Sequence, residues 1–379
     1  MIVTVLAAAY LALLLIKSVL AVRAARRAPS AAFADWADVA IAQPILSGDP
    51  GLSRTLEDNL KALPWAHFIW LIDADDPVAV GICSVLQQRY SETRIDILTL
   101  PAAAVAENPK VFKLSRARPL IRERILLVLD DDTRMPAATL SALVAALDRH
   151  ELATALPAYV DGGEWPSRLL AAFVNNNAAL TYLPLLNVAP AITINGMAYA
   201  IATATLDRFG GFEAVLGSVT DDLAVASRVR AIGGRIWQSA SPVWVETTVS
   251  DGRQYLRQMH RWYVFAVILV AGQRPAMQMA IAGLNAMPSL LLWIVVFLAV
   301  WRPSFVGMAV LAATLVLRGV VIAVLQRHIY GRSIHRPLYS VASELLQPWH
   351  LVHALVQRTI AWRTRRYRVF LDQTFRAVR

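Results

Sequence analysis

An unbroken apolar run leads directly into three carboxylates at Ile125-Leu126-Leu127-Val128-Leu129-Asp130-Asp131-Asp132. A short apolar run of this length predicts a strand that is buried on both faces. Such strands belong to parallel sheets covered by helices, and these sheets bind ligands beyond the carboxyl ends of their strands. The stretch therefore predicts an α/β domain with acidic side chains at its ligand-binding edge.

Similar apolar runs alternate with helical stretches on both sides of this strand, from about residue 38 to residue 240. Further strands are predicted at residues 39–45, 68–72 and 95–100, and helices at residues 77–90 and 136–149. This alternation is typical of a doubly wound sheet in which most strands are parallel. We expect this α/β fold over residues 28–250.

Three long apolar segments lie outside the predicted α/β domain. The composition is 57% hydrophobic with a mean hydropathy of +0.48, which is too apolar for a soluble domain alone. Residues 2–22, 277–300 and 305–325 are each about long enough to cross a bilayer. Because arginines follow the first run instead of preceding it, a retained anchor is favoured over a cleaved signal peptide. The sequence thus predicts an N-terminal transmembrane helix within residues 1–27 and a transmembrane helical hairpin within residues 276–326.

The charge distribution orients these segments. The sequence holds 37 Lys and Arg residues against 27 Asp and Glu residues, and the region after Leu325 is rich in arginine. Basic residues beside membrane spans favour the cytoplasmic side. We therefore expect a multi-pass protein of a bacterial-type inner membrane, with the α/β domain and a basic tail at 327–379 in the cytoplasm and with no nucleic-acid partner. Cys83 is the only cysteine, which excludes an internal disulfide and a cysteine-based zinc site.

The acidic triplet at the end of the predicted strand indicates a metal site. Asp130 and Asp132 point the same way in an extended chain, and adjacent carboxylates repel one another without a counter-ion. Mg²⁺ or Mn²⁺ prefers oxygen ligands and commonly combines one or two carboxylates with phosphate oxygens. We expect Asp130 and Asp132 to bind such a cation together with a diphosphate. A solvated acidic loop is the alternative.

Two further aspartates stand at predicted helix starts. Asp76 precedes a proline at the end of a predicted strand, where a carboxylate can accept hydrogen bonds from a nucleotide base or ribose. Asp222 begins another predicted helix, and a carboxylate there can take the proton of an acceptor hydroxyl. Helix capping is the alternative interpretation for both residues.

A basic and aromatic run, Gln258-Met259-His260-Arg261-Trp262, stands just before the predicted hairpin. Helical spacing places Gln258, Arg261 and Trp262 on one face, where the guanidinium can grip a diphosphate and the indole can offer a flat surface. An interfacial belt of arginine and tryptophan is the alternative. We assign residues 251–275 to the membrane interface.

The order of these motifs resembles that of the processive and lipid-directed members of glycosyltransferase family 2. Their signature of Asp, Asp-x-Asp, Asp and Gln-x-x-Arg-Trp corresponds here to Asp76, Asp130-x-Asp132, Asp222 and Gln258-x-x-Arg261-Trp262. Within that superfamily the chain is most similar to ceramide glucosyltransferases and bacterial hopanoid-associated glycosyltransferases. Segments 43–50, 75–77, 108–110 and 362–368 carry this likeness. Gln43 replaces the usual lysine, and residues 175–177 lack a histidine seen in animal ceramide enzymes.

The resemblance implies a GT-A-type nucleotide-sugar domain and a role for each motif. Asp76 would contact the nucleotide, Lys110 and Arg261 the diphosphate, Asp130 and Asp132 the metal and sugar diphosphate, with Gln258 and Trp262 completing the donor site and Asp222 as general base. The implied reaction is inverting, metal-dependent transfer from a UDP-sugar to the hydroxyl of a membrane lipid, such as a sphingolipid or hopanoid, at the cytoplasmic leaflet. A processive polysaccharide synthase and a noncatalytic membrane scaffold are the alternatives.

Overall fold

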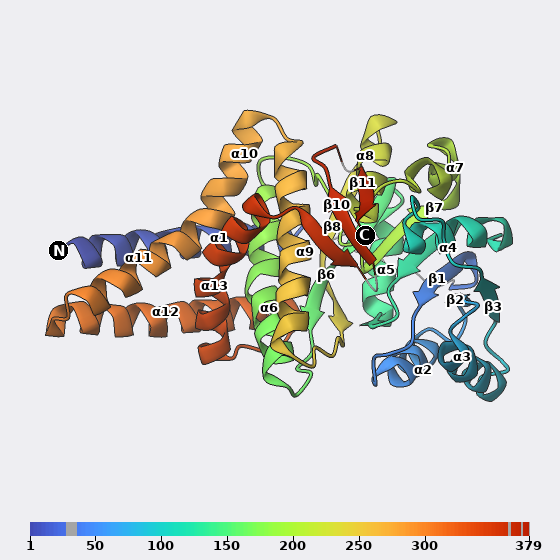
Figure 1. Ribbon diagram of the computed structural model, residues 1–379, viewed down its shortest axis with the longest axis horizontal. Helices are drawn as coiled ribbons and strands as arrows, with labels where there is room; N and C mark the ends of the chain where they lie inside the picture. Colours follow the sequence, from blue (N-terminus) through green and yellow to red (C-terminus); the bar gives the residue numbers. More distant parts are fainter. Residues whose placement is uncertain (28–35, 363–364, 373, 379) are drawn as a thin grey trace.

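The computed structural model describes residues 1–27, 36–362, 365–372 and 374–378. Long helices project from one end of a larger domain that contains a sheet, and the N-terminus lies at the far tip of these helices (Figure 1). The α/β domain was expected to begin at residue 28, so its first expected residues, 28–35, lie outside the described part of the chain.

Eight strands form the main sheet in the order β3-β2-β1-β4-β7-β6-β8-β5. They are β1 (Val39–Ile45), β2 (His67–Asp73), β3 (Ile95–Leu100), β4 (Ile125–Leu129), β5 (Thr133–Arg134), β6 (Leu152–Tyr159), β7 (Ala198–Ala202) and β8 (Ile236–Val245). Strands β3, β2, β1 and β4 are mutually parallel, and so are β6 and β8, whereas β7 and β5 run antiparallel to their neighbours. The predicted α/β fold with a mostly parallel sheet is confirmed, and its second half is mixed.

Helices cover both faces of this sheet. They are α2 (Leu52–Ala62), α3 (Pro77–Arg89), α4 (Pro109–Ala117), α5 (Ala137–Ala146), α7 (Thr203–Arg208) and α8 (Asp221–Ala231). Successive side chains of a strand point to opposite faces, so Ile41 of β1 packs with α2, α3 and α5, while Ala42 packs with α4, α7 and α8. Because both faces are buried, the central strands are continuous apolar runs in the sequence.

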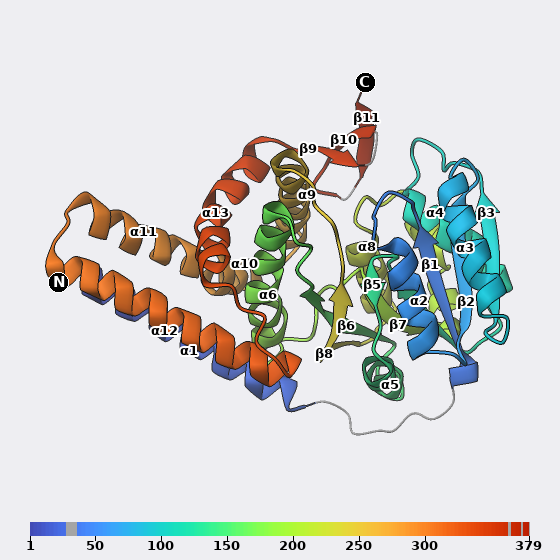
Figure 2. The ribbon, with the colours of Figure 1, turned by 90° about the horizontal axis from the view of Figure 1, so that it is seen from below.

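Three apolar helical segments of the described chain are long enough to cross a membrane: Ile2–Ala25, Pro275–Trp301 and Phe305–Tyr330. The first is α1 and the last is α12. The middle one consists of α10 (Pro275–Ile281), a π-helical turn (Ala282–Ala286) and α11 (Met287–Trp301). Helix α1 packs against both α11 and α12 (Figure 2). The predicted N-terminal apolar helix and C-terminal hairpin are therefore confirmed as elements of the fold.

Helix α6 (Trp165–Leu185) joins the two parts of the molecule. It packs against β6 on one side, and against α1 and α13 (Pro337–Val356) on others. The Asn175 side chain accepts from the N–H of Tyr159 at 2.7 Å and donates to its carbonyl at 2.9 Å. Asn176 donates to the Ser340 hydroxyl of α13 at 2.8 Å. These hydrogen bonds explain how an apolar stretch carrying asparagines packs inside the protein.

The arginine-rich C-terminal region is folded. Helix α13 packs against α6, α11 and α9 (Gly252–Ala271). A three-stranded antiparallel sheet follows, made of β9 (Thr359–Trp362), β10 (Arg365–Val369) and β11 (Phe375–Val378). Positions 363–364 of the family-like segment 362–368 lie outside the described residues. The region expected to be a tail thus contributes a helix and a small sheet that pack around α9.

Candidate active site

A lysine and two aspartates meet at the carboxyl end of the sheet. Asp130 follows β4 directly, and its Oδ1 lies 2.6 Å from Lys110 Nζ. Lys110 stands in the first turn of α4, where the Asn108 side chain caps the helix and accepts from the Lys110 N–H at 3.0 Å. The same Nζ lies 3.3 Å from Asp221 Oδ2 and donates to the Gly196 carbonyl at 2.7 Å. The structure therefore brings the predicted residues Lys110 and Asp130 together.

The carboxylates keep Lys110 protonated. Burial lowers the pKa of Lys110, but the charges of Asp130 and Asp221 outweigh burial and raise it above its ordinary value. Burial also raises the pKa of Asp130, in spite of the nearby ammonium group. A permanently charged ammonium at this edge of the sheet is suited to contact an anionic ligand.

Asp132 stands two residues after Asp130 and is bound by two hydroxyl groups. The Thr133 hydroxyl donates to its Oδ1 at 3.1 Å, and the Thr247 hydroxyl donates to its Oδ2. Burial and the charge of Asp130 raise the pKa of Asp132 to about 6. The two carboxylates therefore repel each other, and a cation bound by both would relieve that repulsion.

The donor set of this pair fits a cation that arrives with a diphosphate. Among the described residues, no group of three or more His, Cys, Asp or Glu side chains is arranged to hold a metal ion. Mg²⁺ commonly binds only one or two carboxylates and completes its coordination shell with water and phosphate oxygens. Asp130 and Asp132 match that pattern and offer too few ligands for a tight site of their own.

Asp222 lies in the first turn of α8, against the backbone of Gly196. A Cβ built on Gly196 would be 3.2 Å from Asp222 Cβ and 3.6 Å from its Oδ2. Asp222 Oδ1 accepts from the Leu223 N–H at 2.8 Å. Burial and the charge of Asp221 raise the pKa of Asp222 to about 7. A carboxylate with a pKa near neutrality is well suited to act as a general base.

The predicted Gln-x-x-Arg-Trp run lies on α9. Arg261 donates to Gln258 Oε1 at 2.7 Å, one turn away. Burial lowers the pKa of Arg261, while the charges of Tyr159 and Asp130 act in the opposite direction. The Trp262 ring lies 6.2 Å from the ring centres of both Tyr159 and Phe173. Arg261 therefore acts on the acidic cluster electrostatically, and Trp262 packs among protein aromatic rings.

Asp76 is a helix cap in this structure. Its Oδ1 accepts from the Ala79 N–H at 3.0 Å, and its Oδ2 accepts from the Ser47 N–H at 2.8 Å. Burial raises the pKa of Asp76, but the hydrogen bonds from Ser47 and Ala79 more than compensate and lower it. The carboxylate thus fixes the loop after β1 to the start of α3, and its contact with a nucleotide stays a prediction.

Several further residues make contacts at this site that local sequence patterns do not predict. Asp49 accepts from the Thr248 N–H at 2.8 Å and so ties the loop after β1 to the loop after β8. Asp131 accepts from the Leu46 N–H at 2.7 Å. Lys113, which is buried, lies 3.0 Å from Asp73 Oδ2. Asp131 belongs to the quoted acidic triplet, but its partner, like that of Asp73, comes from a distant segment, and no local spacing reveals it.

The fold is that of a GT-A-type glycosyltransferase domain, with acidic and basic side chains gathered at the carboxyl edge of the sheet. The profile of Glycosyl transferase family 21 matches residues 1–374, so the chain belongs to that family. No curated protein matches the chain.

One solved structure supports the fold. The chain is similar to a mannosyltransferase, PcManGT from Pyrobaculum calidifontis in complex with GDP-Man and Mn²⁺, with 16% identity, a TM-score of 0.52, and 93% of this chain and 98% of that chain covered. It is also similar to TarS from S. aureus in complex with UDP-GlcNAc, with 10% identity, a TM-score of 0.41, and coverage of 90% and 99%. At 16% identity, the likeness to the mannosyltransferase shows the fold alone.

Proposed function

We propose that this glycosyltransferase transfers a sugar, with inversion, from a UDP-sugar to the hydroxyl of a membrane lipid at the cytoplasmic leaflet. The observation that carries the proposal is Asp222, a carboxylate with a pKa near 7 that lies beside the cluster of Lys110, Asp130 and Asp221. As a base, Asp222 would act next to groups that can hold the leaving diphosphate, which supports the proposal.

In the proposed reaction, the Asp222 carboxylate takes the proton of the acceptor hydroxyl as that oxygen attacks the anomeric carbon. The bond between the anomeric carbon and the phosphate oxygen breaks, and its electron pair leaves with the nucleoside diphosphate. Lys110 and Arg261 stabilise the negative charge that develops there. Asp76, Gln258 and Trp262 position the donor. A divalent cation on Asp130 and Asp132 would neutralise part of the diphosphate charge.

The fold neighbour supports the choice of donor class and cation. The Pyrobaculum mannosyltransferase was solved with a nucleoside-diphosphate sugar and Mn²⁺. The two-carboxylate donor set of Asp130 and Asp132 fits Mn²⁺ or Mg²⁺ held jointly with phosphate oxygens. We assign UDP as the nucleotide from the motif resemblance.

The three apolar helices support a lipid acceptor and an inner-membrane location, because a soluble acceptor requires no such attachment to the bilayer. In this proposal residues 1–27 anchor the chain, residues 28–250 form the catalytic domain, and residues 251–275 lie at the interface. Arg23, Arg26 and Arg27 follow the first span on the side of the catalytic domain, which favours the cytoplasm for that domain.

The test is transfer by the full-length protein in vesicles of bacterial lipid, offered a panel of labelled UDP-sugars, with the lipid product identified by mass spectrometry. Asp222→Asn should reduce transfer about 10²-fold to 10⁴-fold and leave UDP binding intact. Glu92→Gln, an exposed carboxylate at the other edge of the sheet, is the matched control. Retained turnover in Asp222→Asn would remove the assigned base. A polymeric product would identify a processive synthase, and no metal-dependent UDP release from any donor would identify a scaffold.

A further inference from the structure

Helix α13 buries polar side chains and exposes apolar ones, which is the reverse of a helix on the surface of a soluble protein. Its buried face carries polar side chains at a spacing of three and four residues: Ser340, Ser343, Gln347 and His350. Its exposed face carries large apolar side chains: Leu338, Trp349, Val352, Leu355 and Val356. An exposed apolar stripe of this size indicates contact with something other than water. The helix is therefore built to place its outer face in an apolar medium.

The position of α13 identifies that medium. The helix packs against α11, which belongs to a candidate membrane span, and lies beside the base of α11 and α12 (Figure 2). Arg318 of α12 bonds to two residues of α13. It contacts the Glu344 carboxylate at 2.7 and 2.6 Å and donates to the Ser340 hydroxyl at 2.7 Å. An apolar face continuous with membrane helices faces lipid.

An apolar groove lies behind α13. Its volume is about 620 Å³, and its apolar walls come from three helices: Leu346 of α13, Trp165 and Leu169 of α6, and Tyr255 and Leu256 of α9. Trp165 and Leu256 are each 54% exposed at its margin. A Cβ on Gly252 would be 3.2 Å from the Trp165 ring, so glycine allows α9 to begin this close to α6.

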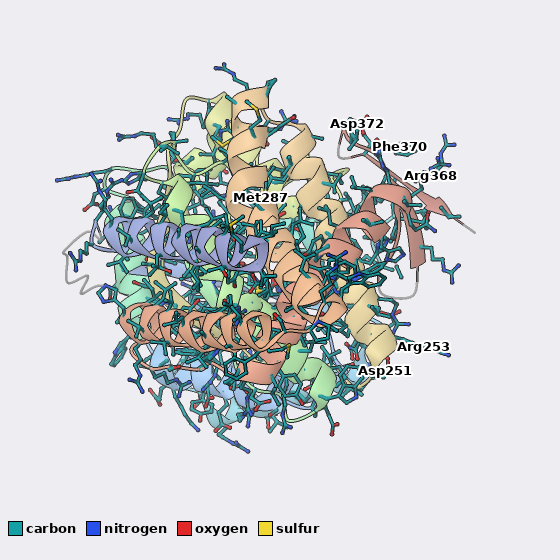
Figure 3. The ribbon with its side chains drawn as sticks, turned by 90° about the vertical axis from the view of Figure 1, so that its left-hand side faces the viewer. Asp251, Arg253, Met287, Arg368, Phe370 and Asp372 are labelled. Atoms are coloured by element: carbon teal, nitrogen blue, oxygen red, sulfur yellow. The ribbon has the colours of Figure 1, made fainter. Side chains whose placement is uncertain are left out.

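Part of the groove lining lies on the side of the molecule from which the apolar helices project. Figure 3 looks along the projecting helices, and Asp251 and Arg253, which also line the groove, are seen from that side at the start of α9. The polar end of the groove consists of these two residues, with Asp251 capping α9 by accepting from the Gln254 N–H at 2.8 Å.

Aromatic side chains continue from the groove towards the reaction centre. On α6, Trp165, Leu169 and Phe173 follow one another at intervals of four residues and so share a face. Phe173 stacks on Trp262, with ring centres 6.2 Å apart, and Trp262 meets Tyr159 edge to face. The charge of Asp132 contributes to the raised pKa of Tyr159, after burial. A row of packed apolar and aromatic side chains therefore extends from the groove lining towards the acidic cluster.

We propose that this groove between α6, α9 and α13 receives a hydrocarbon chain of the lipid acceptor, which enters from the bilayer alongside α13. The inference rests on the proposed transfer to a lipid and adds where the lipid is held. A chain is the occupant that fits, because the groove is apolar, is of the size of a small-molecule site and is continuous with lipid-facing helices.

The experiment uses the full-length protein in phosphatidylcholine vesicles that contain a ceramide with a photoreactive diazirine near the end of its acyl chain. After illumination, labelled peptides are mapped by mass spectrometry. Labelling is expected at Tyr255, Leu256 and Leu346. Leu346→Trp places an indole in the groove and should reduce that labelling about tenfold. Val352→Trp, on the outward face of the same helix, is the matched control and should leave it unchanged.

Leu256→Trp is a second filling variant at the exposed margin, where folding is little affected, and it should act in the same direction. Labelling that is confined to α1, α11 and α12 overturns the proposal. The proposal also fails if both filling variants label the groove as strongly as the wild-type protein does. Glycolipid formation by the wild-type protein is measured in parallel. Glycolipid without groove labelling refutes only the groove, whereas labelling without glycolipid from any UDP-sugar refutes the proposed transfer.

Discussion

Gly196 lies so close to Asp222 that a Cβ on the glycine would stand 3.2 Å from Asp222 Cβ. The Gly196 carbonyl also accepts from Lys110 Nζ at 2.7 Å. The same backbone segment therefore contacts Asp222, the proposed base, and Lys110, which is proposed to bind the diphosphate. The position of this segment therefore sets the geometry of proton removal.

Gly196→Ala should lower kcat several-fold, because a Cβ 3.2 Å from Asp222 Cβ would push the proposed base aside by a fraction of an ångström, and a misplacement of a full 1 Å costs about 10²-fold. The KM for the donor should change less, since Asp130, Asp132 and Arg261 are untouched. Gly81→Ala is the control: Gly81 is also a non-strained glycine, and a Cβ there meets nothing within 4 Å. Steady-state kinetics check this, and an unchanged kcat in Gly196→Ala would contradict the close packing.

The pH dependence of transfer should follow Asp222. Its pKa is raised to about 7, and a base acts in its ionised form, so kcat should rise with pH through about 7. The charge of Asp221 is a cause of that raised pKa, second to burial. Asp221→Asn should therefore move the acidic limb of the profile to lower pH. The pH–rate profiles of the two proteins test this, and a limb that does not move would show that another group is titrating.

The carboxylates that follow strands were predictable, because a buried strand appears in the sequence as an apolar run and the first charged residue after that run marks the end of the strand. Asp130 and Asp132 follow from that pattern alone. Of the two hydrogen bonds that Asp76 accepts, only the one from Ala79 was predictable, because capping of α3 is a local pattern. The bond from Ser47 spans 29 positions, and no local pattern indicates it.

The remaining contacts depend on tertiary packing. The bond between Asp49 and Thr248 joins residues 199 positions apart, and no periodicity in either segment indicates it. The position of α13 was hidden for another reason. The arginines of residues 327–379 indicate a charged tail, whereas the polar side chains that α13 buries have partners on distant helices: Ser340 on α6 and α12, and His350 on α9.

Cation binding should depend on the nucleotide. The described residues offer Asp130 and Asp132 but no group of three ligating side chains, so Mn²⁺ alone should bind weakly and UDP should complete its coordination. Thermal unfolding should therefore shift upward more with Mn²⁺ and UDP together than with the sum of the separate shifts. Asp132→Asn should abolish the excess, and Glu92→Gln should keep it. A large shift with Mn²⁺ alone would contradict a two-carboxylate site.

Glu344 ties α13 to the apolar helices α1 and α12 through Tyr10 and Arg318. The Arg318 side chain is only 1% exposed, and its guanidinium bonds Glu344 at 2.6 Å; the Tyr10 hydroxyl of α1 donates to the same carboxylate at 3.1 Å. Glu344→Ala leaves this cation buried without its partner, which costs about 3–5 kcal/mol of folding stability.

Replacing both members with apolar residues, as in Arg318→Met with Glu344→Leu, should recover most of that loss, because neither charge then remains buried. Leu338→Ala, on the exposed face of α13, is the control. Thermal unfolding of the detergent-solubilised protein gives the comparison. If the double variant were no more stable than Glu344→Ala, the loss would arise from packing around Glu344 and not from the stranded charge of Arg318.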